Sequence, residues 1–575
     1  MLKKLWSRVR EYKRATFLTP FFVALEVVTD VLIPLLMARL IDFGIDAGDM
    51  DAILKYGLLL LLCALGSLLF GTLAGQTAAT ASAGFAKNLR HDMFYQVQEF
   101  SFANIDRFSS ASIVTRLTTD VTNVQQAFQM MTRIMVRAPL MLVFSLIMVI
   151  TRSSQLSLIF LGALPILGAG IFLIMRRAFP AFEKMFKAYD KLNNVVQENL
   201  RGIRVVKSYV REDHESEKFS NVAGELYGLN CMAERTISFS MPLMQLCIYS
   251  AMILISWFGA RLVVGGSLST GDLTSVFSYS MQILMSLMMV SMSIVMVTMS
   301  KASAERIVEI LDEVPDLADP ENSVTKVRDG SIVFQNVDFS YSKDPGKLAL
   351  SGVNLTIPSG QTVGILGGTG SAKSSLVQLI PRLYDVTAGA VLVGGVDVRE
   401  YDLEVLRDAV AVVLQKNVLF SGTIKENLRW GNPDATDEEL VRACRLACAD
   451  EFIQTFPDQY DTYIEQGGTN VSGGQKQRLC IARALLKKPK ILILDDSTSA
   501  VDTKNDALIR QAFREELPDT TKLIIAQRVS SIQDADQIVI LDNGRIHAVG
   551  THEELLANDQ IYQEVYHSQQ KGGLE

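Results

Sequence analysis

Charged residues are scarce in this sequence. Only 20% of the 575 residues are charged, whereas 49% are hydrophobic, and the mean hydropathy is +0.23. This balance is unusual for a soluble protein and indicates membrane-spanning segments. An excess of basic residues is also lacking, because the formal net charge is −7. We therefore expect no nucleic-acid partner, since a nucleic-acid binder shows a basic face.

Cysteine is scarce as well and follows no metal-ligand pattern. Cys63 and Cys247 lie in apolar runs, and Cys444 and Cys448 have no second pair and no histidine nearby. We interpret all six cysteines as reduced thiols of a protein in the cytosol and membrane. The N-terminal stretch "MLKKLWSRVREYKRATF" lacks a small-residue cleavage site, so we expect no cleavable signal peptide.

Long apolar runs are plentiful, and all of them come before about residue 310. Each reaches the ~20 residues that cross a ~30 Å hydrocarbon core. The six predicted spans are 16–42, 55–80, 129–151, 155–176, 237–265 and 273–300. Lys and Arg, which favour the cytoplasmic side, gather at the N-terminus and in the two long segments 81–128 and 177–236. We therefore expect both termini and both long loops to be cytoplasmic.

The second half has short β-rich runs, glycine loops and amphipathic stretches. Alternating strands are expected in "SIVFQNVDFSY" and "GVNLTI", and a strand, a glycine loop and a helix over 362–384. The apolar runs "AVAVVL", "KILILDD" and "KLIIAQ" follow, separated by helical stretches. This order predicts a parallel-sheet α/β domain.

The predicted fold class is therefore multidomain, with an all-α six-helix transmembrane domain and an α/β P-loop nucleotide-binding domain. The predicted parts are the transmembrane domain over 1–310, a linker over 311–327 and the nucleotide-binding domain over 328–575.

The stretch "GGTGSAKSS" has nearly the pattern of a phosphate-binding loop. Ala372 stands where that pattern has its last glycine. Lys373 would reach the β- and γ-phosphates, and the Ser374 hydroxyl would bind Mg²⁺. Taken alone, the stretch fits a glycine-rich turn without a ligand equally well. The predicted loop residues are Gly367, Gly368, Thr369, Gly370, Ser371, Ala372, Lys373, Ser374 and Ser375.

Two further motifs follow the loop in order. The apolar strand "ILILDD" (491–496) ends in two carboxylates, of which Asp495 would hold Mg²⁺ through water. The run "VSGGQKQR" (471–478) precedes it. Together with the loop, these motifs resemble the ATP-binding cassette (ABC) family, whose signature is LSGGQ. Six spans followed by one cassette resemble an ABC exporter half-transporter over essentially the whole chain.

The resemblance implies a mechanism and further site residues. Two cassettes would sandwich two ATP molecules, each between one chain's phosphate loop and the other chain's signature, so this chain needs a partner. Tyr341 matches the aromatic residue that stacks on adenine, Gln415 the glutamine at the metal site, and "SAVD" (499–502), with Asp502, the D-loop. The implied metal-site residues are Ser374, Gln415 and Asp495, and the implied signature residues are Ser472, Gly473, Gly474 and Gln475.

Three positions depart from the family pattern, and all concern hydrolysis. Asp496 stands where the family has a catalytic glutamate, and a carboxylate about 1 Å too far away can cost ~10²-fold in rate. Gln527 replaces the switch histidine and cannot carry a proton, and Ala372 is the third departure. The signature is almost unaltered. We therefore predict one subunit of a heterodimer, with a slow site of its own and a signature that completes the partner's site. A homodimer with two slow sites is the alternative.

Two features of the membrane half are candidates for the substrate cavity. Glu26 and Asp30 lie four apart in the first span and so on one helix face, and Arg133 and Arg137 open the third span. An ion-pair network and an acidic patch that attracts cationic substrates both fit. The last span has methionines at helical spacing, which suit varied apolar compounds or plain packing. They are Met281, Met285, Met288, Met292, Met296 and Met299, of which we take Met285 and Met292 as cavity candidates.

Three cytoplasmic segments carry further expectations. By resemblance, "ANIDRF" (103–108) and "KSYVREDHESEKF" (207–219) contain the short coupling helices that dock on the cassettes. The segment "KKLWSRVREYKR" fits an amphipathic helix on the inner membrane surface, or a disordered basic tail.

The predicted function is that of a subunit of an ATP-driven exporter of multiple drugs or amphipathic compounds, in a bacterial plasma membrane with the cassette in the cytoplasm. Lipid, peptide or thiol-compound export and an ATP-gated regulatory protein are the alternatives.

Overall fold

The computed structural model describes residues 1–497 and 501–571, which divide into two compact units. The first comprises Met1–Gln98 and Ser110–Glu313, and the second Glu99–Ser109 and Val314–Glu575.

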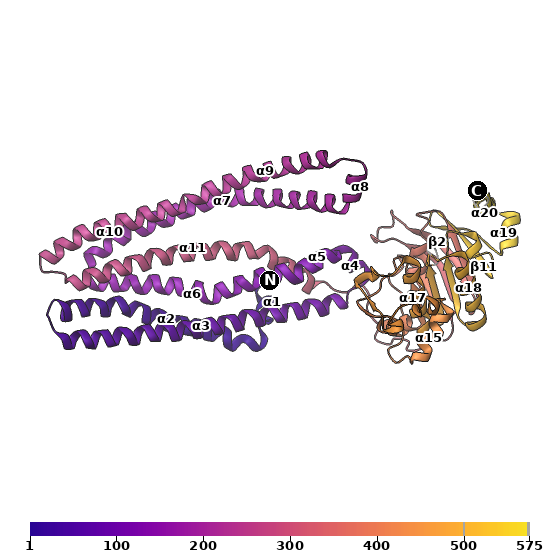
Figure 1. Ribbon diagram of the computed structural model, residues 1–575, viewed down its shortest axis with the longest axis horizontal. Helices are drawn as coiled ribbons and strands as arrows, with labels where there is room; N and C mark the ends of the chain where they lie inside the picture. The colour runs from indigo at the N-terminus through magenta and orange to yellow at the C-terminus, as the bar shows by residue number, and fades with distance from the viewer. Residues whose placement is uncertain (498–500, 572–575) are drawn as a thin grey trace. The chain divides into compact units, whose positions relative to one another are not determined.

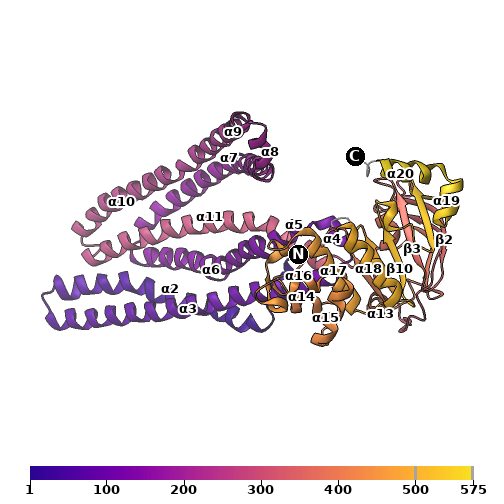
Figure 2. The same ribbon diagram turned by 45° about the vertical axis from the view of Figure 1, so that its right-hand side comes forward.

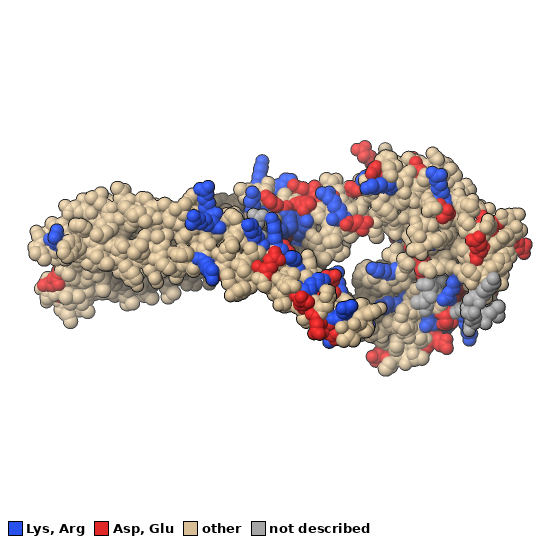
Figure 3. All heavy atoms as spheres, turned by 90° about the horizontal axis from the view of Figure 1, so that it is seen from above, with Lys and Arg blue, Asp and Glu red and all other residues tan. Residues whose placement is uncertain are grey.

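The first unit is entirely helical in its regular structure. Its helices are α1 (Leu2–Ser7), α2 (Lys13–Leu40), α3 (Met50–Gln98), α5 (Ser110–Thr115), α6 (Val121–Arg152), α7 (Ser154–Arg201), α8 (Ile203–Ser208), α9 (Glu212–Ser238), α10 (Ser240–Val264) and α11 (Thr270–Asp312). Six stretches of the described residues are long and apolar enough to cross a membrane, which confirms the predicted six spans. Their apolar band carries almost no charged side chains (Figure 3). Helix α7 pairs with α9 over one part of its length and with α10 over another, and α8 joins α7 to α9 (Figures 1 and 2).

Polar side chains fix how the spanning helices begin. Ser153 accepts a hydrogen bond from the backbone N–H of Leu156 at the start of α7 (3.3 Å). At the start of α11, the carboxylate of Asp42 accepts hydrogen bonds from the Ser269 hydroxyl (2.6 Å) and the Gly271 N–H (2.8 Å). The bonds to Leu156 and Gly271 satisfy backbone N–H groups in the first turn of a helix, which have no partner within the helix itself. The bonds from Asp42 also hold α11 close to the end of α2.

The N-terminal segment before α2 is α-helical only over Leu2–Ser7, so the predicted amphipathic helix is shorter than expected. Helix α1 spans only six residues, and the backbone turns at Arg10, which has a φ of +43°. Leu5 and Val9 are buried, and the Arg8 guanidinium pairs with Asp92 on α3 (2.7 Å). The segment is thus folded against its own unit, which also excludes the disordered tail.

The second predicted coupling segment, 207–219, overlaps a short helix only at its first two residues. Helix α4 (Phe102–Phe108) agrees with the prediction at 103–108. The short helix of the second loop is α8, however, and most of 207–219 belongs to α9. The reason is that Glu212, Asp213 and Glu215 fall in the first turn of α9, where acidic side chains favour a helix start.

The second unit contains two larger sheets. Its strands are β1 (Ile332–Phe339), β2 (Leu350–Ile357), β3 (Thr362–Gly367), β4 (Ala388–Val393), β5 (Val396–Asp397), β6 (Val410–Val413), β7 (Gly422–Thr423), β8 (Tyr463–Ile464), β9 (Ile491–Asp495), β10 (Thr521–Ile525), β11 (Gln537–Asp542) and β12 (Arg545–Gly550). The six-stranded sheet has the order β12-β11-β3-β10-β9-β6 and is parallel except for β12. Strands β3 and β10 lie side by side in it (Figure 2). The predicted α/β fold is therefore confirmed.

The first two strands do not join this parallel sheet. They form a separate antiparallel sheet of order β2-β1-β4-β5. Residues of β2 alternate in burial, whereas every residue of β9 and β10 is buried. A strand with one solvent-exposed face suits an antiparallel sheet, and a strand buried along its whole length suits a parallel sheet that is covered on both faces.

Helices surround these sheets. They are α4 (Phe102–Phe108), α12 (Lys373–Gln378), α13 (Leu403–Ala409), α14 (Ile424–Arg429), α15 (Asp437–Leu446), α16 (Asp450–Ile453), α17 (Gly473–Leu486), α18 (Thr503–Glu516), α19 (His552–Asn558) and α20 (Gln560–Lys571).

We predict that Gly271→Ala destabilises the helical unit. A Cβ at this position would overlap the carbonyl oxygen of Ala38 on α2, which is backbone and cannot move aside cheaply. Overpacking of this kind costs about 1–3 kcal/mol. The thermal unfolding temperature of the chain in detergent should fall. Gly162→Ala is the matched control, because a Cβ there meets no atom within 4 Å and the substitution should leave the unfolding temperature unchanged or higher. Equal shifts would contradict the close approach of α11 to α2.

Candidate functional site

A cavity of about 860 Å³ in the second unit brings together most of the predicted nucleotide-site residues. They come from chain segments far apart in sequence. The predicted residues that line it are Tyr341, Gly367, Gly368, Thr369, Gly370, Ala372, Lys373, Ser374, Ser375, Gln415, Asp495, Asp496 and Gln527. Ser371, the four signature residues and Asp502 do not line it. Ser499 and Ala500 of the predicted D-loop lie outside the described residues.

The sheet explains why these residues meet. The phosphate loop follows β3, the two carboxylates end β9, and Gln527 follows β10. Strand β10 lies between β3 and β9 and is parallel to both. Parallel neighbours have their carboxyl ends at the same edge of a sheet, which is where ligands of such sheets bind.

The phosphate loop closes around its own lysine. The Lys373 ammonium donates to the carbonyl oxygens of Gly367 and Gly368, each at 2.8 Å. Burial lowers the pKa of Lys373, and the charges of Asp495 and Asp496 oppose that change. Ala372 has a φ of +69°, in the left-handed region that costs a residue with a Cβ roughly 1–2 kcal/mol. The loop thus keeps its form although the glycine that usually permits it is missing.

The two oxygen groups that the sequence predicts to bind a divalent cation lie side by side. The Ser374 hydroxyl donates to Asp495 Oδ1 at 3.1 Å. Burial raises the pKa of Asp495, the hydrogen bond from Ser374 lowers it, and the charge of Asp496 raises it further. Hard oxygen donors facing a cavity fit Mg²⁺, which usually takes one or two protein oxygens, waters and substrate phosphate. No cluster of three or more His, Cys, Asp or Glu side chains that could hold a metal by itself occurs among the described residues.

Asp496 is held by amide groups from two directions. Its Oδ2 accepts hydrogen bonds from the side-chain amide of Gln527 at 2.9 Å and from that of Gln415 at 3.4 Å. The backbone at Asp496 also has a positive φ of +48°. The carboxylate at the catalytic-base position is therefore engaged by neutral amides that cannot accept a proton from it.

Helix α20 holds the segment that carries Gln527, a contact that the sequence motifs did not reveal. The side-chain amide of Gln569 donates to the Gln527 carbonyl, and its oxygen accepts from the Val529 N–H, both at 2.8 Å. Ile561 and Val565 of the same helix line the cavity. The spacing of four among Ile561, Val565 and Gln569 puts them on one helix face, and it is the signal in the sequence from which this contact could have been found.

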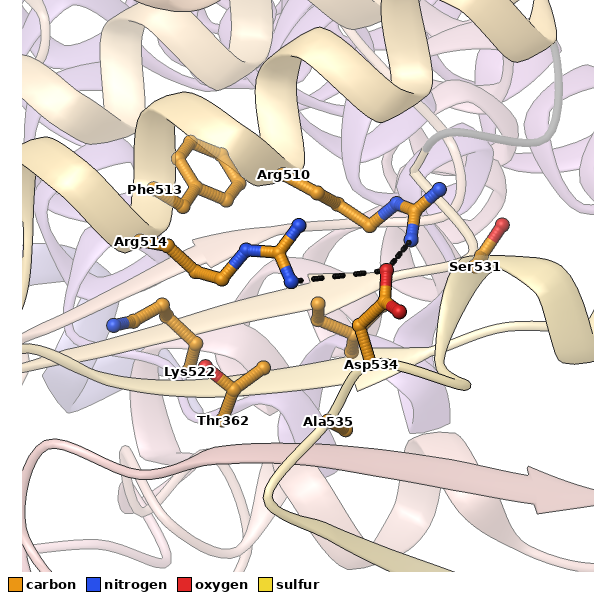
Figure 4. A pocket seen from close by; sticks show the side chains of 9 residues that line it. Thr362, Arg510, Phe513, Arg514, Lys522, Ser531, Asp534 and Ala535 are labelled. Carbon is orange, nitrogen blue, oxygen red and sulfur yellow. Dashed lines mark hydrogen bonds and ion pairs between the residues drawn. The ribbon is translucent and has the colours of Figure 1, made fainter. Parts of the chain in front are cut away.

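The same segment is tied to α18 further along. The Ser531 hydroxyl donates to Asp506 at 3.1 Å, and Arg510 and Arg514 point toward Asp534, with Arg510 at 3.2 Å (Figure 4). The cavity among these side chains is only about 20 Å³, enough for a water-sized molecule. We interpret the cluster as an anchor for the switch segment 527–531.

The signature residues form the start of an exposed helix. The Ser472 side chain accepts a hydrogen bond from the Gln475 N–H (3.3 Å), and the Gln475 side chain accepts one from the Ser472 N–H (2.8 Å). This reciprocal capping box begins α17. Ser472 and Gly473 are exposed, whereas Val471, which replaces the usual leucine, is buried in the core.

Two aromatic residues link the cavity to helix α4 within the second unit. The hydroxyl groups of Tyr341 and Ser375 share a hydrogen bond at 2.8 Å, and Tyr341 packs edge-on against Tyr384. The Tyr384 hydroxyl donates to Asp106 on α4 at 2.7 Å. Burial and the bond to Asp106 raise the pKa of Tyr384, so it stays a donor. Tyr384 was not among the predicted residues, because it belongs to no motif.

The acidic pair of the first span is part of an ion-pair network. Arg137 reaches Asp30 at 2.9 Å and Glu26 at 3.3 Å, and the Ser67 hydroxyl donates to Asp30 at 2.6 Å. This geometry favours the ion-pair interpretation over an open acidic patch. Met285 and Met292 are exposed on α11.

We predict that Gln569→Ala loosens the switch segment without unfolding the domain. Loss of the bonds to Gln527 and Val529 should speed backbone hydrogen exchange around Val529 by roughly fivefold to tenfold. Gln570→Ala is the matched control, since Gln570 on the same helix bonds only to the Tyr566 hydroxyl among the described side chains. If both variants change exchange at Val529 equally, α20 does not act through Gln569.

Comparisons with known proteins agree with this architecture. Residues 16–287 match the model of the ABC transporter transmembrane region, and residues 350–499 match that of the ABC transporter domain. An ABC transporter ATP-binding protein of Mycobacterium tuberculosis is 36% identical over 99% of this chain and 98% of its own length, and one of Bacillus subtilis gives the same three values. A bacterial Atm1-family ABC exporter, solved with ATP bound, superimposes with a TM-score of 0.82 at 25% identity over 97% of this chain and 98% of its own. The chain therefore belongs to the ABC exporter family, with a transmembrane domain and an ATP-binding domain in one polypeptide.

Proposed function

We propose that this chain is one subunit of a heterodimeric ATP-driven exporter of amphipathic small molecules in a bacterial plasma membrane. Its own ATP site would hold nucleotide and hydrolyse it slowly. Its signature would complete the partner's competent site.

The cavity residues suit Mg-ATP in the roles the motifs imply. Lys373 would leave the carbonyls of its own loop for the β- and γ-phosphate oxygens, and Tyr341 would lie against the adenine. Ser374, Asp495 and Gln415 would hold the cation that neutralises phosphate charge. Binding requires no change in the strand framework, because the residues already face one cavity.

The bonding of Asp496 is the observation that carries the proposal. A general base must be free to take a proton from water within about 2.6–3.2 Å. Asp496 is one methylene shorter than the glutamate of the family, and its Oδ2 already accepts bonds from Gln527 and Gln415. Gln527 can donate to a phosphate oxygen but cannot carry a positive charge. Both groups needed for rapid turnover are thus replaced by weaker ones in the same site.

The signature supports the second half of the proposal. It does not line this chain's own cavity, yet its helix is capped and its first residues are exposed. The phosphate groups of an ATP molecule bound to the second chain would need an exposed, pre-formed helix N-terminus of this kind. The arrangement fits a chain that supplies an intact signature to a partner while its own catalytic residues are degenerate.

We predict that the two ATP sites contribute unequally. Asp496→Asn in this chain should change the ATPase rate of the complex by less than about threefold, whereas the matching Glu→Gln change in the partner should lower it by ~10²-fold or more. Steady-state phosphate release from the purified complex measures both. Equal losses would contradict the proposal, and robust hydrolysis by this chain alone would favour the homodimer.

We also predict that the signature acts in trans. Ser472→Ala should lower the ATPase rate of the complex about tenfold, because it removes a polar group at the expected phosphate position of the partner's ATP. Thr436→Ala is the matched control, since Thr436 forms the same kind of capping box at the start of α15. Each change should cost about 1 kcal/mol of cap stability. The proposal fails if both variants lose the same fraction of activity.

A further inference from the structure

The helical unit contains a cavity whose charged lining residues are arginines. The cavity has a volume of about 410 Å³ and lies between α6 and α11. Its polar lining is Gln126, Gln129, Arg133 and Arg137, and its apolar lining includes Met289 and Met296. The volume falls within the ~300–1,000 Å³ of typical small-molecule sites.

The two arginines of this cavity differ in whether they have carboxylate partners. Arg137 is committed to Glu26 and Asp30, as described above. Arg133 lies one turn earlier on α6 and, among the residues that the structure describes, forms no ion pair with a carboxylate. A cation in a membrane-spanning helix is costly, and such residues usually face a partner or a pathway. Arg133 is therefore a positive charge that the fold places at the cavity without a counter-ion.

A cationic ligand fits this cavity poorly. Neither Glu26 nor Asp30 lines it, and their side chains are only 8% and 17% exposed. To reach them, a cation would have to displace Arg137, and the displaced guanidinium would lose two carboxylate partners. Among the described residues that line the cavity, the charge left without a carboxylate partner is that of the half-buried Arg133.

The rest of the lining suits an amphipathic ligand. Gln129 and Gln126 lie one and two turns before Arg133 on α6 and offer amide donors. Methionine side chains are flexible and polarizable, so Met289 and Met296 can pack against apolar groups of varied shape. Met285 and Met292, which the sequence had suggested, belong to the neighbouring strip of α11 and do not line the cavity.

We propose that this cavity binds amphipathic anions, with a carboxylate, sulfonate or phosphate group at Arg133 and an apolar tail against Met289 and Met296. Binding of the anion needs neither ATP nor turnover. Only the further step, export of the bound anion, rests on the proposed function. The anionic group can belong to a free amphiphile or to a lipid headgroup.

The test uses the full-length chain in phosphatidylcholine nanodiscs without ATP. The probes are a dansyl-labelled fatty acid and a dansyl-labelled alkyltrimethylammonium of equal chain length. We expect the acid to bind more tightly than the ammonium. Arg133→Gln should weaken binding of the acid roughly tenfold, and Arg133→Lys, which keeps the charge, should stay within about threefold of the unchanged chain.

Arg261→Gln is the matched control, because Arg261 lies over the Trp257 ring on α10, outside this cavity. It should leave binding of the acid unchanged. If Arg133→Gln does not fold, Met296→Glu serves instead, and it should weaken the acid and strengthen the ammonium. Nanodiscs with added phosphatidylglycerol show which kind of molecule supplies the anionic group at Arg133. If this lipid displaces the labelled acid, the site binds a lipid headgroup. If it does not, the site binds a free amphiphile.

Two results would overturn the inference: equal binding of acid and ammonium by the unchanged chain, or equal losses in Arg133→Gln and Arg261→Gln. Neither result bears on which ATP site hydrolyses. Conversely, equal ATPase losses from the two catalytic-position variants would refute the heterodimer proposal and leave the anion site standing.

Discussion

The parallel pairing of β10 with both β3 and β9 is the constraint on which the nucleotide site depends. Ile525 of β10 is aligned with Ile365 of β3 on one side and with Asp495 of β9 on the other. Because β9 and β10 are paired along their whole length, a shift of register would move Asp495 away from the carboxyl end of β10 and so from the cavity. The phosphate loop, the two carboxylates and Gln527 therefore have fixed positions before any ligand binds.

Within this framework, the switch segment is restrained from three directions. The Gln527 side chain is bonded to Asp496, Gln569 of α20 holds the backbone at Gln527 and Val529, and Asp506 of α18 holds Ser531. A histidine at this position could gain or lose a proton as charge develops, whereas a glutamine keeps the same donors throughout. A restrained, neutral switch suits a site that retains nucleotide better than one that cycles rapidly.

The site residues that could be predicted from the sequence are those that belong to short local motifs. Lys373, Ser374 and Asp495 belong to short motifs at strand ends, and the sheet topology brings them together. Gln569 and Tyr384 were missed because their partners, Gln527 and Asp106, lie in distant segments and no motif contains them. The substrate cavity is a further case: helical spacing identifies a stripe of methionines, but only packing against α6 decides that Met296 of that stripe, with Met289 beside it, lines a cavity. Met285 and Met292 stay predictions.

The charges of the membrane half show how packing decides between two interpretations that the sequence leaves open. Glu26 and Asp30 in one span look like an acidic patch when read alone, since Arg137 is more than a hundred residues away in the chain (107 from Asp30). Packing of α6 against α2 places the Arg137 guanidinium beside both carboxylates. Its positive charge offsets their negative charges, so a solute in the cavity does not meet an open acidic patch. Arg133, one turn away on the same helix, finds no such pair among the described residues. The charge that remains at the cavity is thus set by which arginine of α6 reaches the carboxylates of α2.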